Sequence, residues 1–239
     1  METDTIWIAS FDIGKKNFSF YIEEMDKKDL GEIQNIKKCD RYEPCGIAKP
    51  EFQKVLDKVC RSGHKILLEN KDLTANTDKS KYLDDLVMYN LTEMLDKYEE
   101  YWEQCDIIII EKQMSFGKIR NPMAIRLEHH TWSYFSIKYG ISKKLVVFMA
   151  YHKTQVLGAE KLETKTKAGK IRYKAVKKPA RKKWAIKEAN RILTMREDDD
   201  TLGVIAISKK KDDLSDVIVQ LQAYKYLEFV ENNLINKIE

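Results

Sequence analysis

With 239 residues, of which 43% are hydrophobic, the chain is long enough and apolar enough to bury a sizeable globular core. It contains no apolar run that could span a bilayer and no signal-peptide pattern, so we expect an intracellular protein with no membrane partner. The net charge of +5 is small, so the distribution of charge along the chain is more informative about binding partners than its total.

The first third of the chain predicts two strands, a short helix and two uncertain segments. Residues 5–12 (TIWIASFD) are apolar and rich in β-formers, and residues 17–24 (NFSFYIEE) have the alternating pattern of a half-buried strand. Gly14 marks a tight turn between the two strands. Residues 31–39 (GEIQNIKKC) are a candidate third strand. Residues 50–61 predict a helix with proline in its first turn, and 64–70 (HKILLEN) is an apolar run of undecided type.

The middle of the chain alternates helical and strand patterns. Residues 80–104 predict one amphipathic helix, and "CDIIIIEKQM" then predicts a strand that is buried on both faces and ends at Glu111. A second helix is expected over 121–139, from an Asn-Pro start to Gly140. Residues 143–151 predict a further strand.

The last third is strongly basic at first and then acidic. Residues 161–187 hold twelve Lys or Arg and a single acid, Glu163, which favours a polyanionic partner. We expect an exposed, mobile loop there, then a helix from Pro179 to about Arg196, a solvated turn at "REDDDTLG" and a final helix. The simplest organisation is one domain, 1–239, with a basic flexible insertion at about 158–180.

The final helix begins with a group of carboxylates. One acid in a first turn is explained by the helix dipole, but Asp212, Asp213 and Asp216 exceed that need. Asp213 and Asp216 are three residues apart and share a helix face, where like charges repel unless a cation lies between them. Asp12 and Glu111 each end a strand. Each acid alone is explained as a solvated terminus, but together they could hold two divalent cations about 3.5–4 Å apart.

Three segments resemble one family. "SFDIGKKNFSFYI", "IIIIEKQM" and "KKDDLSDV" resemble, in this order and spacing from residue 5 to about 225, the RuvC-like branch of the RNase H-like superfamily. Within that branch, the chain resembles the Holliday junction resolvases of poxviruses and other large DNA viruses, and "FGKIRNPMAIRLEHHTWSYF" adds to that resemblance.

The resemblance implies an α/β fold, a five-stranded mixed β-sheet flanked by α-helices. It also implies Mg²⁺-dependent cleavage of branched double-stranded DNA, four-way junctions above all, by a homodimer. Each active site would hold two Mg²⁺ ions, for which Mn²⁺ could substitute, and no small-molecule cofactor. If the chain is viral, cytoplasmic replication sites of the infected cell are implied.

The resemblance also assigns residues. Asp12, Glu111, Asp213 and Asp216 match the catalytic, metal-binding acids, with Asp212 the alternative at the third position. Lys153 in "HKTQVLG" matches a catalytic lysine near the scissile phosphate. Lys183 or its neighbour Lys182 fits a second one, although the long insertion leaves that alignment open. The expected DNA contacts are Lys15, Lys16, Lys118, Arg120, Lys153, Lys182 and Lys183.

Assembly and thiol chemistry give two further expectations. The helix at 121–139 carries Met123, Leu127, Trp132 and Phe135, apolar bulk that we expect at a dimer interface. Four scattered cysteines fit reduced thiols. A zinc site at Cys39, Cys45, Cys60 and His64 is the less favoured alternative, because the spacings match no compact zinc knuckle.

Two other functions stay open at this point. The chain could be an RNase H-like or flap nuclease of broader substrate range, because those enzymes share the metal chemistry. It could also be a non-cleaving junction-binding protein, against which the presence of all four acids argues.

Overall fold

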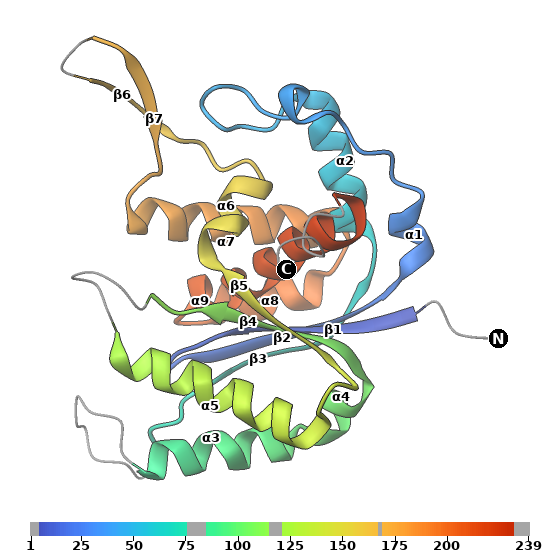
Figure 1. The fold of residues 1–239 in the computed structure, drawn as a ribbon, viewed down its shortest axis with the longest axis vertical. Coiled ribbons are helices and arrows are strands. Elements are labelled where there is room, and N and C mark those ends of the chain that lie inside the picture. Colours follow the sequence, from blue (N-terminus) through green and yellow to red (C-terminus); the bar gives the residue numbers. More distant parts are fainter. Residues whose placement is uncertain (1–4, 76–84, 115–120, 167–168, 232–239) are drawn as a thin grey trace. The chain divides into compact units, whose positions relative to one another are not determined.

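The computed structural model describes residues 5–75, 85–114, 121–166 and 169–231, which divide into two compact units (Figure 1). Unit 1 consists of Met1–Met25 and His64–Ala150, and unit 2 of Asp26–Gly63 and Tyr151–Glu239. In the described part of the chain, no helix is both long enough and apolar enough to cross a membrane.

Unit 1 is built on a five-stranded sheet with the strand order β3-β2-β1-β4-β5. β2 pairs antiparallel with β3, whereas β4 pairs parallel with both β1 and β5, so the sheet is mixed, as expected. The strands are β1 Thr5–Asp12, β2 Phe18–Asp26, β3 His64–Lys71, β4 Cys105–Lys112 and β5 Lys144–Met149. The helices are α3 Asp85–Lys97, α4 Glu99–Gln104 and α5 Pro122–Tyr139.

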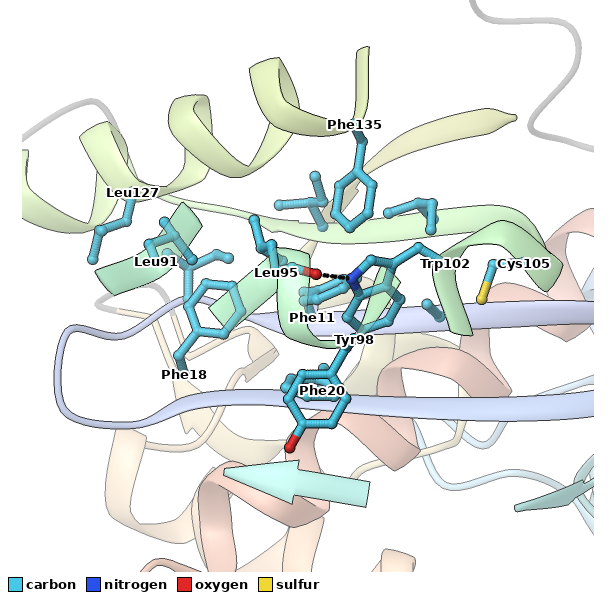
Figure 2. Close-up of a cluster of buried hydrophobic side chains, with 14 of the residues drawn as sticks. Phe11, Phe18, Phe20, Leu91, Leu95, Tyr98, Trp102, Cys105, Leu127 and Phe135 are labelled. Carbon is cyan, nitrogen blue, oxygen red and sulfur yellow. Dashed lines mark hydrogen bonds between the residues drawn. The ribbon is translucent and has the colours of Figure 1, made fainter. Parts of the chain in front are cut away.

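An aromatic core lies between one face of this sheet and the three helices. Phe11 and Phe20 come from neighbouring strands and lie against Trp102 of α4, with ring centroids 5.3 Å from the indole in each case (Figure 2). Phe135 of α5 packs against Phe11 and Trp102 in the same cluster. Fully burying a large apolar side chain stabilises a fold by about 1.5–3 kcal/mol, so this cluster fixes the helices on the sheet. All four isoleucines of β4 are buried, which confirms the strand predicted to be buried on both faces.

The turn between β1 and β2 depends on a glycine. A Cβ atom on Gly14 would lie 2.5 Å from the carbonyl oxygen of Asn17, which is backbone and cannot move aside cheaply. The turn is also tied to the chain beyond β3, because the Leu73 amide donates to the Lys15 carbonyl at 3.0 Å.

The helix predicted over 80–104 is interrupted, and its residues 80–84 lie outside the described part of the chain. α3 ends at Lys97, and the backbone turns at Tyr98 before α4 begins. The indole nitrogen of Trp102 donates to the Leu95 carbonyl at 2.7 Å, and the Tyr98 amide donates to the same oxygen (Figure 2). The break therefore lets Trp102 reach the core with its polar nitrogen paired.

Unit 2 is mostly helical, and its helices α7 and α9 pack along each other. Its helices are α1 Lys27–Gly31, α2 Pro50–Arg61, α6 Ala150–Val156, α7 Lys178–Met195, α8 Asp199–Ile207 and α9 Lys211–Lys225, with a 3-10 turn η1 Lys38–Asp40 and a π-helical turn η2 Tyr226–Val230. A two-stranded antiparallel hairpin, β6 Leu162–Lys165 and β7 Ile171–Lys174, lies between α6 and α7 in the sequence.

Three predictions from the sequence need correction in unit 2. The candidate strand at 31–39 is wrong, because its polar groups bond elsewhere: the Ile36 carbonyl accepts from Arg41, and the Asn35 side chain donates to Val230. The segment "REDDDTLG" is not a solvated turn, because Asp198 caps α8 by accepting from the Thr201 amide at 3.0 Å. The segment expected to be a basic loop contains the β6–β7 hairpin.

We predict that Gly14→Ala lowers the free energy of unfolding by about 1–3 kcal/mol, because the new methyl group must displace backbone. Gly203→Ala is the matched control. It lies in α8 with nothing within 4 Å of an added Cβ, so it should stabilise by roughly 0.5–1 kcal/mol. Urea unfolding of both variants measures the difference, and equal midpoints would contradict the role of the turn.

Candidate active site

In unit 1, parallel pairing of β1 with β4 places two acids at one edge of the sheet. The register pairs Phe11 with Ile110, and the residues that follow are Asp12 and Glu111. Both strands run in the same direction, so their carboxyl ends lie together. Both side chains are partly exposed, whereas the residues before them are fully buried. The strand ends thus present two carboxylates beside an apolar sheet.

A third carboxylate fixes the chain just beyond Glu111. Glu128 of α5 is almost fully buried, and it accepts from the Gln113 amide at 2.8 Å and from Lys112 Nζ at 3.1 Å. Burying a carboxylate is costly unless it is paired and hydrogen-bonded, and here both conditions are met. Sequence reasoning missed Glu128. Its only signal was its position among the apolar residues of the predicted helix.

In unit 2, the first turn of α9 presents the other acids to lysines from two helices. Lys182 of α7 forms an ion pair with Asp212, and its Nζ lies 3.8 Å from Asp213 Oδ1. Lys153 of α6 lies with its Nζ 3.2 Å from Asp216 Oδ1. Lys153 is 6% exposed, so its ammonium group is held largely out of water. These contacts gather three acids and two ammonium groups at one end of α9.

The crowding of these acids changes their proton affinities. Burial, and then the neighbouring charge of Asp212, raises the pKa of Asp213 to about 6. Burial alone would raise the pKa of Asp212 as well, but the hydrogen bond from Lys182 holds it below its ordinary value. Burial likewise opposes the charge on Lys182, and its bond to Asp212 nevertheless raises the pKa of the ammonium group. Of Asp212 and Asp213, Asp213 is therefore the acid whose charge is less compensated.

The donor chemistry fits a divalent cation of the magnesium type. Carboxylate oxygens are the preferred ligands of Mg²⁺. In the described part of the chain, no group of three or more His, Cys, Asp or Glu is arranged to hold a metal ion.

The two candidates for the second lysine differ in their surroundings. Lys182 contacts the acids of α9, whereas Lys183 is exposed and points to a different side of α7. Of the remaining expected DNA contacts, Lys15 is partly exposed and Lys16 exposed. Lys118 and Arg120 lie outside the described residues.

Much of the apolar bulk of α5 is used inside unit 1. Leu127 and Phe135 are fully buried, and Trp132 packs against the same core. Ile137, at 86% exposure, is the large apolar residue that α5 leaves in solvent. The four cysteines are free thiols, and burial raises the pKa of Cys60 to about 12, so that thiol is inert.

Two proteins of invertebrate iridescent viruses are similar to this chain over nearly its whole length. Uncharacterized protein 170L of Invertebrate iridescent virus 6 is 34% identical over 252 residues, covering 95% of this chain and 92% of that protein. Uncharacterized protein 97L of Invertebrate iridescent virus 3 is 32% identical over 226 residues, covering 91% and 98% respectively. No protein-family model matches the chain.

Among solved structures, the yeast mitochondrial Holliday junction resolvase Ydc2 has a similar fold. The TM-score is 0.52 at 11% sequence identity, with 95% of this chain and 80% of that chain covered. This likeness confirms the expected fold, which is that of the RuvC-like resolvases.

We predict that Asp213→Asn stabilises the metal-free protein near neutral pH. A carboxyl whose pKa is raised to about 6 favours the folded state while protonated, and this contribution is lost as the pH rises from about 4 through about 6. Removing the charge should therefore raise the unfolding free energy by on the order of 2 kcal/mol at about pH 7, and by little at about pH 4.

Urea unfolding in the presence of EDTA measures this effect. Asp200→Asn is the control, since Asp200 is exposed in the first turn of α8 and its loss should destabilise by less than about 1 kcal/mol. A destabilised Asp213→Asn at neutral pH would show that the Asp213 charge is already balanced.

Proposed function

The chain belongs to the family of the two iridescent virus proteins, and from this membership and its fold we propose that it resolves four-way DNA junctions. In this proposal it is a structure-selective endodeoxyribonuclease that hydrolyses phosphodiester bonds. The observation that carries the proposal is the pair of acids on each unit: Asp12 and Glu111 at adjacent strand ends, and Asp213 and Asp216 on the first turns of α9.

These four acids are the proposed metal ligands. Asp12, Glu111, Asp213 and Asp216 would together hold two Mg²⁺ ions, or Mn²⁺ in their place. When bound, two such ions activate a water and stabilise the leaving oxygen of a phosphodiester. Glu128 supports Glu111 indirectly, because it fixes the two residues that follow it. Asp212 already forms an ion pair with Lys182, so Asp213 is favoured over Asp212 as the third metal ligand.

The chain's lysines supply the remaining positive charge. Lys153 is fixed beside Asp216 and largely excluded from water, so its charge acts strongly on a nearby phosphate. Near the scissile bond, an ammonium group stabilises the negative charge that develops in the transition state. Lys183 remains the sequence-based proposal for a second such lysine. Lys182 is the other candidate for this role, because its ammonium group lies close to Asp212 and Asp213.

We also propose that a homodimer acts on the junction. Resolution needs one nick on each of two opposing strands, and two copies related by a two-fold axis match that symmetry. The exposed Ile137 of α5 is the apolar surface residue that such an interface could use. Sedimentation of the protein bound to a junction counts the copies, and a single fully active copy would exclude this arrangement.

The decisive test is Mg²⁺-dependent cleavage of a synthetic four-way junction. We expect paired nicks on the junction and little cleavage of a linear duplex or an RNA–DNA hybrid. Equal cleavage of all three substrates would indicate a nuclease of broader range. Tight junction binding without cleavage would indicate a junction-binding protein.

We predict that Asp12→Asn, Glu111→Gln, Asp213→Asn and Asp216→Asn each reduce single-turnover cleavage at least about a hundredfold, because each removes a metal ligand. Junction binding should be largely retained. Asp212→Asn is the matched control on the same helix turn and should stay within about tenfold of the original rate. If Asp212→Asn is inactive and Asp213→Asn is normal, the register of the site on α9 is wrong.

For the lysines, we predict that Lys153→Ala and Lys183→Ala lower the cleavage rate at saturating protein by about tenfold or more, because each removes charge near the reacting phosphate. The neighbouring Lys187→Ala, exposed on α7, is the control and should leave that rate unchanged. A silent Lys183→Ala beside a slow Lys182→Ala would identify Lys182 as the second lysine.

A further inference from the structure

The β6–β7 hairpin is a regular β-ribbon with a defined register. Leu162 pairs with Lys174, and Lys165 pairs with Ile171. The closing turn is held by the Thr166 amide, which donates to the Lys170 carbonyl at 2.9 Å, and by Gly169, whose positive φ of 76° suits a glycine. The segment is therefore an ordered element of unit 2 and not merely a charged connection.

The base of the hairpin is fixed to the rest of unit 2 by backbone contacts. The Lys161 amide donates to the Cys45 carbonyl at 2.8 Å, just before β6 begins. Gly158 approaches Ala48 so closely that an added Cβ would lie 2.8 Å from the Ala48 nitrogen. The hydroxyl of Tyr42 donates to the Val156 carbonyl at 2.8 Å. These contacts give the ribbon a fixed origin, from which it projects away from α7 (Figure 1).

The two faces of the ribbon carry different charge. Paired residues share a face and neighbours alternate, so Arg172 and Lys174 lie on one face with Leu162 and Thr164. The other face carries Glu163, Lys165, Ile171 and Tyr173. The first face thus has two cations and no acid, whereas the second has one cation and one acid.

The two faces are equally exposed. Each has three exposed residues and one half-buried residue, Thr164 on the first face and Tyr173 on the second. Leu162 of the first face and Tyr173 of the second both line a shallow hollow of unit 2. Charge, rather than exposure, therefore marks the face with Arg172 and Lys174 as the one for a polyanionic partner.

We propose that the β6–β7 hairpin is a DNA-binding ribbon whose Arg172–Lys174 face contacts the phosphate backbone of a duplex arm. This inference rests on the proposed function and adds a binding element outside the reaction centre. A two-stranded ribbon matches the width of a DNA major groove, and Arg and Lys are the residues that neutralise phosphates. The exposed apolar residues Leu162 and Ile171 lie on opposite faces, so neither face has the continuous apolar surface that membrane insertion needs.

The test measures equilibrium DNA binding as a function of salt. We use the double variant Arg172→Ala/Lys174→Ala in a chain that also carries Asp213→Asn, so that the DNA stays intact. The probes are a synthetic four-way junction and a linear duplex of one arm's sequence. Losing two phosphate contacts should weaken binding to both probes about tenfold and reduce the salt slope by roughly 1.8.

The control double variant, Lys54→Ala/Lys58→Ala, removes the same charge from exposed positions on α2, where Lys54 already pairs with Glu51. This control should change the salt slope by much less than the roughly 0.9 expected for the loss of one phosphate contact. A second variant, Arg172→Lys, keeps the charge and should keep the slope. Unfolding midpoints equal to that of the parent chain show that the ribbon variants are folded.

The outcomes separate the two proposals. If the unmodified chain cleaves junctions while the ribbon variant binds with the parent slope and affinity, the ribbon inference is overturned and the nuclease stands. If the unmodified chain does not cleave junctions, the proposed function fails. The slope difference then still decides whether the ribbon contacts DNA. A ribbon variant indistinguishable from the α2 control overturns the inference in either case.

Discussion

Carboxylates held close together need cations, and this constraint shapes the start of α9. At the start of α9 the cations are ammonium groups: Lys182 forms an ion pair with Asp212, and Lys153 forms one with Asp216. Asp213 lies 3.8 Å from the Lys182 ammonium group, and burial, followed by the charge of Asp212, raises the pKa of Asp213 to about 6. In the proposed function, a divalent ion beside Asp213 would relieve that imbalance.

Much of the fold could be predicted from sequence, because it follows from local patterns. The fold's local patterns are the apolar, β-rich composition of β1, the alternating residues of β2, the isoleucine run of β4 and the Asn-Pro start of α5. Each of them specifies its element within a few residues. The failures have non-local causes. The helix break at Tyr98 depends on the position of Trp102, whose indole nitrogen donates to the Leu95 carbonyl inside the core. The irregular path of residues 31–39 depends on partners such as Val230, almost two hundred residues away in the sequence.

The candidate site divides in a similar way. Acids at strand ends and at a helix start could be found from sequence, since the elements themselves were predictable and each acid follows an apolar run. Glu128 and the Lys182–Asp212 pair could not. They depend on which face of α5 and α7 turns inward, and on contacts between residues that are 15 and 30 positions apart. The sequence shows which residues carry charge, but only the folded structure shows which charges lie close enough to neutralise one another.

That distinction also bears on how a strongly acidic centre can act on a polyanion. Cations already committed to acids, such as Lys182 and Lys153, cannot at the same time supply long-range attraction for a phosphate backbone. Attraction must come from cations with few acids around them, and Arg172 and Lys174 share their ribbon face with no acid. Surface charge of this kind is screened over about 8–10 Å at ordinary ionic strength, so it influences binding more than the reaction itself. If the proposed ribbon contacts DNA, the placement of cations in unit 2 separates attraction of the substrate from stabilisation of the acids within a single compact unit.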